Sequence, residues 1–165
     1  MTDVEMILEM AEMQKKLDEA LLEKGRQLGK IQSYNEERTI FALIDEIGEL
    51  VHELKGEWCW WKATQKPVER VKVLEELVDA WHFGLSLDNH NERDLKLFDE
   101  WIQLPLCDRH VLKKIHSSIY FALRDELVTP ELYKLTYALG FTMEEVYNGY
   151  IAKNKENYAR IERGY

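Results

Sequence analysis

Two pairs of acidic residues recur at the same spacing in the sequence and could bind a divalent metal ion. Glu46 and Glu49 are three residues apart, and Glu76 and Asp79 repeat that spacing about thirty residues later. Residues three apart lie on one face of an α-helix, so two such helices packed antiparallel would bring four carboxylates together. Oxygen ligands without a thiolate suit Mg²⁺ or Mn²⁺, whose coordination is commonly completed by water and substrate phosphates. The spacing therefore predicts a magnesium site between two helices.

The segment that carries the second pair indicates why its carboxylates are not simply solvated. Residues 74–87 read LEELVDAWHFGLSL, which places apolar side chains on nearly every side of a helix. Such a helix is buried, and a buried carboxylate such as Asp79 is costly unless it is paired or binds a metal. The segment around Glu46 and Glu49 has an ordinary apolar stripe, and its acidic face alone fits a solvated surface equally well. The metal-site prediction therefore depends mainly on the second segment.

Helix signals run along the whole chain. A hydroxyl residue followed three positions later by a glutamate fits the capping box, and proline at a first helical position or glycine after a last one marks the other boundaries. These signals are Thr2, Ser33, Thr142, Pro67 and Pro130 for starts, and Gly56 and Gly140 for stops. They predict helices at residues 2–24, 33–55, 67–89, 91–102, 108–127, 130–139 and 142–163. We expect an all-α bundle of about seven helices, with the second and third forming an antiparallel pair.

Composition limits the class of protein. A chain of 165 residues is expected to form one domain, residues 1–165. Lys and Arg number 22 against 31 Asp and Glu, and this net charge of −9 argues against a broad nucleic-acid interface. No apolar run approaches the ~20 residues that span a membrane, and the first residues do not resemble a secretory signal. Two widely spaced cysteines predict reduced thiols and a cytoplasmic protein.

The acidic motifs, taken with four further stretches, resemble those of a known family. Glu46-x-x-Glu49 followed by Glu76-x-x-Asp79 is similar to the metal motif of the all-α nucleoside triphosphate pyrophosphatases, which include MazG-like enzymes and dimeric dUTPases. The dUTPase branch is favoured by four stretches: MQKKLDEAL at 13–21, EWCWWK at 57–62, EELVDAWHFGLSL at 75–87 and YIAKNKENYARIERGY at 150–165. Residues 91–140 contribute little, and Arg160-Ile161 departs from an Arg-Gln in the family pattern. The resemblance implies Mg²⁺-dependent hydrolysis of dUTP to dUMP and pyrophosphate, with activity on dUDP left open.

The C-terminal segment supplies donors for a triphosphate. Lys153, Asn157 and Arg160 fall at i, i+4 and i+7, on one face of the expected helix, although ordinary solvated residues would show the same spacing. Lys62 could add another positive charge. The resemblance implies that Asn154 belongs to the same phosphate-binding set.

Aromatic and amide side chains could bind the base. The loop between the acidic helices holds three tryptophans, and the resemblance implies that Trp61 stacks on uracil, while Trp58 and Trp60 are expected in the core. Gln14 offers both a donor and an acceptor to the Watson–Crick edge of uracil, although a glutamine in a helix is more often just exposed. Asp18 joins it in the first motif of the resemblance.

The chemistry expected is hydrolysis of a phosphoanhydride by a water molecule. Glu49 is our choice for the residue that orients or deprotonates this water, because one oxygen could hold a metal while the other holds the water. The residues alone do not say which phosphorus is attacked. The resemblance suggests a departure from the attack at the α-phosphate made by the unrelated trimeric dUTPases.

Three other functions fit parts of the sequence. The nearest is a MazG-like pyrophosphohydrolase of broader nucleotide specificity, which only the Gln14 and tryptophan-loop resemblances oppose. Glu49 with His52 and Asp79 with His82 mimic the carboxylate–histidine pairs of di-iron bundles, which need further glutamates from two other helices. A helical interaction module without catalysis would leave Asp79 unexplained.

Apolar side chains in excess of what seven helices can cover predict a homodimer. The helix around Trp81, together with Trp101 and the IYFAL run at 119–123, is expected to lack neighbours within one chain. Small helical domains bury such an excess in a symmetric interface. The resemblance also implies a dimer, with active sites near the subunit boundary.

Overall fold

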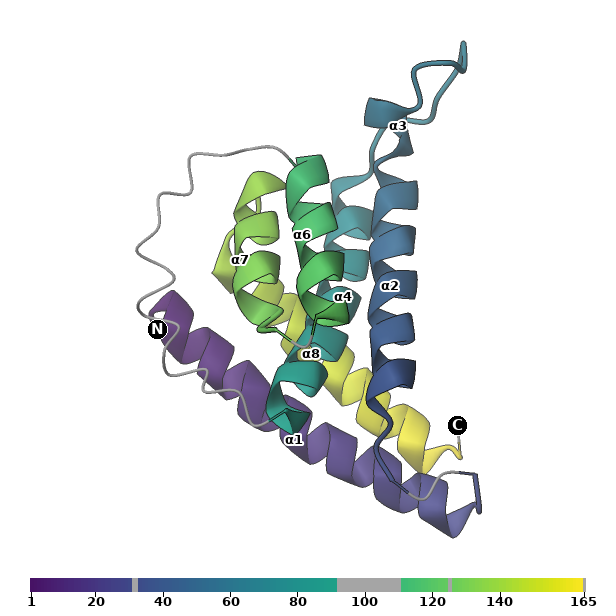
Figure 1. Cartoon of the computed structure of the whole chain (residues 1–165), viewed down its shortest axis with the longest axis vertical. Coiled ribbons are helices and arrows are strands. Elements are labelled where there is room, and N and C mark those ends of the chain that lie inside the picture. The colour runs from purple at the N-terminus through teal and green to yellow at the C-terminus, as the bar shows by residue number, and fades with distance from the viewer. Residues whose placement is uncertain (31–32, 92–110, 125, 165) are drawn as a thin grey trace.

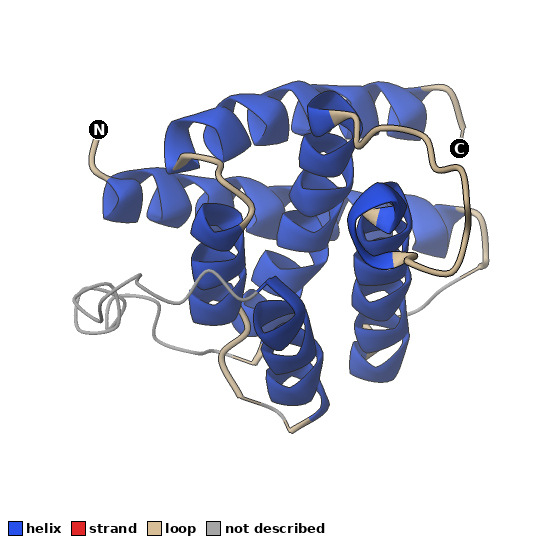
Figure 2. Ribbon diagram, turned by 90° about the horizontal axis from the view of Figure 1, so that it is seen from above, coloured by secondary structure: helices blue, strands red, loops and turns tan. Residues whose placement is uncertain are grey.

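The all-α prediction is confirmed. The computed structural model describes residues 1–30, 33–91, 111–124 and 126–164, and all regular structure in these ranges is helical (Figures 1 and 2). The helices are α1 (Asp3–Gln27), α2 (Glu36–Glu53), α3 (Lys55–Trp58), α4 (Arg70–His90), α6 (Val111–Leu123), α7 (Thr129–Ala138) and α8 (Met143–Glu162). The helix expected at 91–102 lies outside the described residues. None of the described helices is long and apolar enough to cross a membrane.

The predicted helix starts at Thr2 and Thr142 and the predicted stop at Gly140 are confirmed. Thr2 and Thr142 each accept a hydrogen bond from the glutamate backbone three residues on, and that glutamate side chain accepts one in return. Gly140 follows α7 with a φ of 80°, which glycine adopts without strain.

Three of the predicted boundary signals are wrong, and the helix expected at 108–127 ends at Leu123. Asn35, not Ser33, caps α2, because its side chain accepts from the backbone N–H of Arg38 at 2.9 Å. Pro67 does not begin a helix, since α4 starts at Arg70. Gly56 lies inside the short helix α3, where an added Cβ would come within 2.7 Å of the Lys66 carbonyl oxygen. The chain before and after Pro67 therefore closes the loop against α3 before α4 begins.

The helices form two groups that cross each other. α2 and α4 pack antiparallel over most of their length, and this contact is the most extensive between any two described helices (Figure 1). α1 and α8 lie side by side and run across α4. α6 and α7 pack on each other, α7 against α4 and α6 against α2. This arrangement brings residues from both ends of the chain next to the α2–α4 pair.

α4 forms the centre of the core within a single chain. Trp81 is 0% exposed, and its indole N–H donates to Oγ1 of Thr136 on α7 at 3.1 Å. An added Cβ at Gly84 would clash with a methyl group of Leu132, so α4 and α7 are in close contact there. The expectation that α4 and Trp81 lack neighbours in one chain is therefore wrong. Trp101 lies outside the described residues, and of the run at 119–123 only Tyr120 and Leu123 are exposed.

Candidate active site

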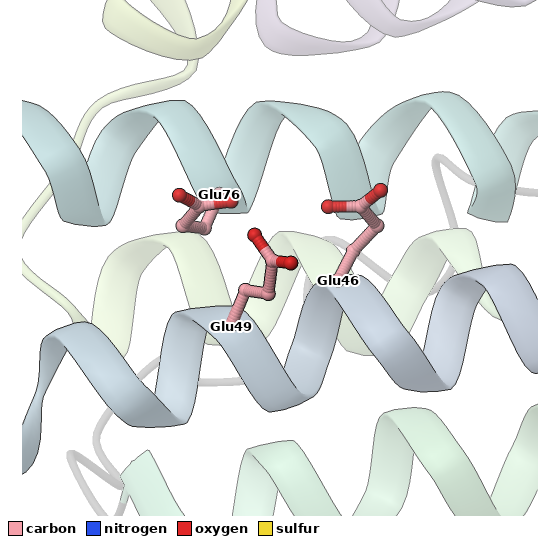
Figure 3. A group of neighbouring side chains, drawn as sticks. All are labelled: Glu46, Glu49 and Glu76. Carbon is pink, nitrogen blue, oxygen red and sulfur yellow. The ribbon is translucent and has the colours of Figure 1, made fainter.

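Three of the four predicted metal ligands meet between α2 and α4. Glu46 and Glu49 project from α2 toward Glu76 of α4, and one carboxylate oxygen from each lies within 4.8 Å of the others (Figure 3). The antiparallel packing of two helices with i, i+3 acids produces this arrangement. We call these three residues the carboxylate group.

The electrostatics of the carboxylate group favour a bound cation. Burial, followed by the charges of neighbouring carboxylates, raises the pKa of Glu46 and of Glu76 to about 7. Three ionised carboxylates at this distance repel one another, and a divalent ion would remove that repulsion. The donors are all hard oxygens, and no histidine or cysteine of the described chain joins them, so the group fits Mg²⁺ or Mn²⁺.

Asp79 lies beside the carboxylate group but is bound to a cation of the chain itself. The ammonium of Lys153, on α8, is 2.6 Å from Oδ2 of Asp79. The Asp79 charge contributes to the raised pKa of both Glu46 and Glu76, so all four acids share one electrostatic environment. The structure thus brings three predicted ligands together and pairs the fourth with a predicted phosphate ligand.

A cavity of about 790 Å³ opens next to the carboxylate group. Its walls come from α1, α2, α4, α8 and the chain after α1. Its polar and charged lining comprises Gln14, Asp18, Lys24, Lys30, Glu46, Glu49, Asp79, His82, Lys153, Asn157 and Arg160. Its apolar lining comprises Leu17, Leu21, Leu28, Phe83 and Ile161. The cavity therefore combines acidic, basic and apolar side chains.

The basic face of α8 borders this cavity as its spacing predicted. Lys153, Asn157 and Arg160 all line it, whereas Asn154 is buried and is not part of the lining. Lys24 and Lys30 also line the cavity, and sequence reasoning did not select them. Their positions at the end of α1 carried no signal, because lysines near the C-terminus of a helix are common.

Gln14, the residue predicted to bind the base, is buried, so the alternative of an ordinary exposed glutamine does not hold. Its side chain is only 3% exposed, and its Nε2 donates to Asp18 Oδ1 at 2.7 Å. Its Oε1 accepts from the Tyr150 hydroxyl and faces Nδ1 of His82, each at 2.7 Å. Both acceptor positions of the amide oxygen are thus occupied within the chain, and one amide hydrogen remains for a ligand.

The tryptophan loop extends past α3, at the end of the helix pair where α2 ends and α4 begins (Figure 1). Trp58 packs against the core as predicted, with its indole N–H donating to the Val51 carbonyl at 2.8 Å. Trp60 is 87% exposed, so its prediction as a core residue is wrong. Trp61 is 59% exposed, and neither it nor Lys62 lines the cavity of its own chain.

The raised pKa values predict a pH-dependent stability that one substitution should remove. The pKa of Glu76 is about 7 in the folded chain and 4.5 in the unfolded chain, so the folded chain binds this proton more tightly. The contribution of Glu76 to the free energy of unfolding is therefore complete below pH 4.5 and is lost as the pH rises through 7. In chelator, the Tm of Glu76→Gln minus that of the wild type should therefore increase between about pH 5 and about pH 8. Glu75→Gln, an exposed neighbour outside the carboxylate group, serves as the control. A Glu76→Gln difference that does not change with pH would contradict the electrostatic account.

A family model described as dUTPase matches residues 6–165, which is nearly the whole chain. No curated protein matches the sequence.

Proposed function

Since the chain belongs to the dUTPase family and is a dUTP diphosphatase, we propose that it hydrolyses dUTP at the carboxylate group and in the cavity beside it. The observation that supports this location is the convergence of Glu46, Glu49 and Glu76 within 4.8 Å at a cavity lined by basic side chains of α8. The family match requires a site for a triphosphate, and this cavity combines ligands for a metal with donors for phosphates.

The metal is proposed to be Mg²⁺, with Mn²⁺ as a substitute. Held by the carboxylate group and by Asp79, it would neutralise phosphate oxygens and lower the pKa of the attacking water. Lys153 would then change partner. Its ammonium pairs with Asp79 when no metal is bound and would donate to a phosphate oxygen once the metal occupies Asp79. Asn157 and Arg160 extend the same face of α8, and Asn154 stays in the proposed set as a buried neighbour that supports it.

Glu49 is the proposed general base. It is the most exposed member of the carboxylate group and also lines the cavity, so a water molecule can reach it from the substrate side. Accepting a proton from that water as it attacks a phosphorus is the task of a general base in phosphoanhydride hydrolysis. The water oxygen forms a bond to the attacked phosphorus, the phosphoanhydride bond to the leaving phosphate breaks, and the two products, dUMP and pyrophosphate, are then released from the same cavity.

The nucleoside is proposed to lie toward the apolar lining of the cavity. Phe83, Leu17 and Ile161 offer apolar surface for the ring and the sugar, and Gln14 offers its remaining amide hydrogen to a uracil carbonyl. Asp18 fixes the orientation of the Gln14 amide, because its Oδ1 accepts a hydrogen bond from Gln14 Nε2. These contacts would hold the uracil base in the cavity.

A nucleotide panel tests this function. Pyrophosphate release with Mg²⁺ should be fastest from dUTP, with dCTP, dTTP and UTP much slower, because the base and the sugar are both bound in the cavity. Phosphate release from dUDP would show whether the shorter substrate is also accepted. Equal rates on all four triphosphates would point to a MazG-like enzyme of broad specificity.

The enzyme is proposed to act as a homodimer. Trp61 and Lys62 do not line the cavity of their own chain, so we expect a second chain to present them to the substrate. Light scattering should report about twice the 19.6 kDa mass of one chain. Mixing Glu49→Gln with the double variant Trp61→Ala/Lys62→Ala should restore up to about a quarter of wild-type activity through mixed dimers. A fully active monomer would contradict this arrangement.

A further inference from the structure

A chain of buried hydrogen bonds crosses the floor of the cavity. Ser86 Oγ donates to Asp18 Oδ2 at 2.8 Å, and Gln14 Nε2 donates to Asp18 Oδ1 at 2.7 Å. Beyond Gln14 the chain continues to Tyr150 and His82, both 2.7 Å from its Oε1. All five side chains are at most 8% exposed. The network therefore holds each polar atom in a defined orientation.

This network determines which nitrogen of His82 carries hydrogen. Asp18 accepts hydrogen bonds at both of its oxygens, from Ser86 Oγ and from the Gln14 amide nitrogen, so the Nε2 side of the Gln14 amide faces it. The Oε1 side must then face His82, and Nδ1 of the imidazole has to donate to it. In a neutral ring the other nitrogen, Nε2, is left with a lone pair. His82 is thus held as an acceptor.

The Nε2 atom of His82 is an acceptor whose partner is missing. Within the part of the chain that the structure describes, this atom is buried and has no hydrogen-bond partner. Burial, and to a lesser extent the charge of Lys153, lowers the pKa of His82 to about 3, so the ring stays neutral. The ring is stacked on Tyr150 with centroids 4.0 Å apart and cannot easily turn to another partner. Buried polar groups normally have a partner, and His82 borders the cavity.

We propose that Nε2 of His82 accepts a hydrogen bond from the nucleoside half of dUTP and that His82 is a specificity-determining residue of this enzyme. The inference rests on the proposed function. Two neutral donors are available in the nucleoside, the N3–H of uracil and the 3′-hydroxyl of the sugar. Gln14 cannot accept from either, because its Oε1 already accepts from Tyr150 and His82. The acceptor becomes available when a ligand enters the cavity and displaces the side chains that cover it.

A pair of variants separates this role from a structural one. His82→Asn keeps an N–H that can donate to Gln14 but lacks the Nε2 acceptor, whereas Tyr150→Phe removes the other donor to Gln14 and leaves His82 intact. Each is assayed by kcat/KM on dUTP, on N3-methyl-dUTP and on 2′,3′-dideoxyuridine triphosphate. The wild type should prefer dUTP to the analogue that lacks the bonded donor by about 10²-fold or more.

In His82→Asn the ratio of kcat/KM on dUTP to kcat/KM on the analogue that lacks the bonded donor should fall close to one, and the ratio for the other analogue should not change. The variant loses the hydrogen bond to dUTP, whereas the analogue made no such bond in the wild type. Loss of preference for the N3-methyl analogue identifies uracil as the donor, and loss for the dideoxy analogue identifies the sugar. Tyr150→Phe should lower kcat/KM for all three substrates by the same factor. Unchanged preferences in His82→Asn would overturn the proposal.

A second measurement needs neither turnover nor a variant. The ¹⁵N NMR shifts of His82 in the wild-type protein should report a neutral ring protonated at Nδ1, and only the Nε2 signal should move toward the hydrogen-bonded range when α,β-imido-dUTP binds. Binding without a change at Nε2 would also overturn the proposal. Absence of dUTP hydrolysis in the panel assay would instead count against the proposed function, so the two failures are distinguishable.

Discussion

Replacing Glu49 with glutamine is expected to lower kcat by about 10²- to 10⁴-fold, the range that a general base contributes. Glutamine keeps the size of the side chain but cannot accept a proton from water, and it also weakens metal binding. The chain should stay folded, because Glu49 is exposed and its charge repels Glu46 and Glu76. The Tm without metal should therefore stay level or rise. Pyrophosphate release and thermal unfolding on the same preparation measure both effects.

Glu53→Gln is the matched control for this experiment. Glu53 lies one turn farther along α2 and is not a member of the carboxylate group. Its replacement removes the same charge from the same helix and should leave kcat nearly unchanged. Near wild-type activity in Glu49→Gln would exclude Glu49 as the base. A Tm that falls sharply in chelator would show that Glu49 stabilises the fold.

Removing divalent metal is expected to abolish turnover and to lower the Tm. Chelator leaves the carboxylates without a counter-ion, so their repulsion returns and the phosphates lose their main ligand. At a free Mg²⁺ concentration 100 times its Kd, binding would stabilise the folded chain by about 2.7 kcal/mol, and a non-hydrolysable dUTP analogue should add to this. Differential scanning fluorimetry across a Mg²⁺ titration, with and without the analogue, measures both contributions.

The double variant Glu46→Gln/Glu76→Gln provides the control for metal removal. It lacks two of the three members of the carboxylate group, so its Tm should respond little to Mg²⁺ or chelator. Its Tm in chelator should exceed that of the wild type at neutral pH, because two groups with raised pKa values have been neutralised. A wild-type Tm and activity that are both indifferent to chelator would refute the metal site.

The sequence alone determined the features that depend on neighbours along the chain. The capping boxes at Thr2 and Thr142 satisfy backbone groups within one turn, so their pattern is visible without a fold. The i, i+3 spacing of the acids determined which side of α2 and α4 they share. The nearly all-round apolar character of α4 predicted its burial, which Trp81 confirms. The dUTPase motifs, read together, indicated the family that the match over residues 6–165 establishes.

Tertiary structure decided which of two similar residues lies at the candidate active site and which one holds two helices together. Asp79 and Asp88 both lie in the apolar helix α4, yet Asp88 is fully buried and accepts the backbone N–H groups of Val128 and Thr129 at the start of α7. Asp79 meets Lys153, 74 residues away. Nothing in the local sequence separates the two acids, because the difference depends on which helix crosses α4 at each position.

The same reason explains the burial of Gln14 and the wrong prediction for Trp60. Gln14 is buried because α8 and α4 bring Tyr150 and His82 to its amide oxygen, and these residues are 136 and 68 positions away. Trp60 is exposed because its loop extends beyond the helix pair, where no other described element covers it. Hydrogen bonds and packing across such separations depend on the path of the whole chain, so only the folded structure determines them.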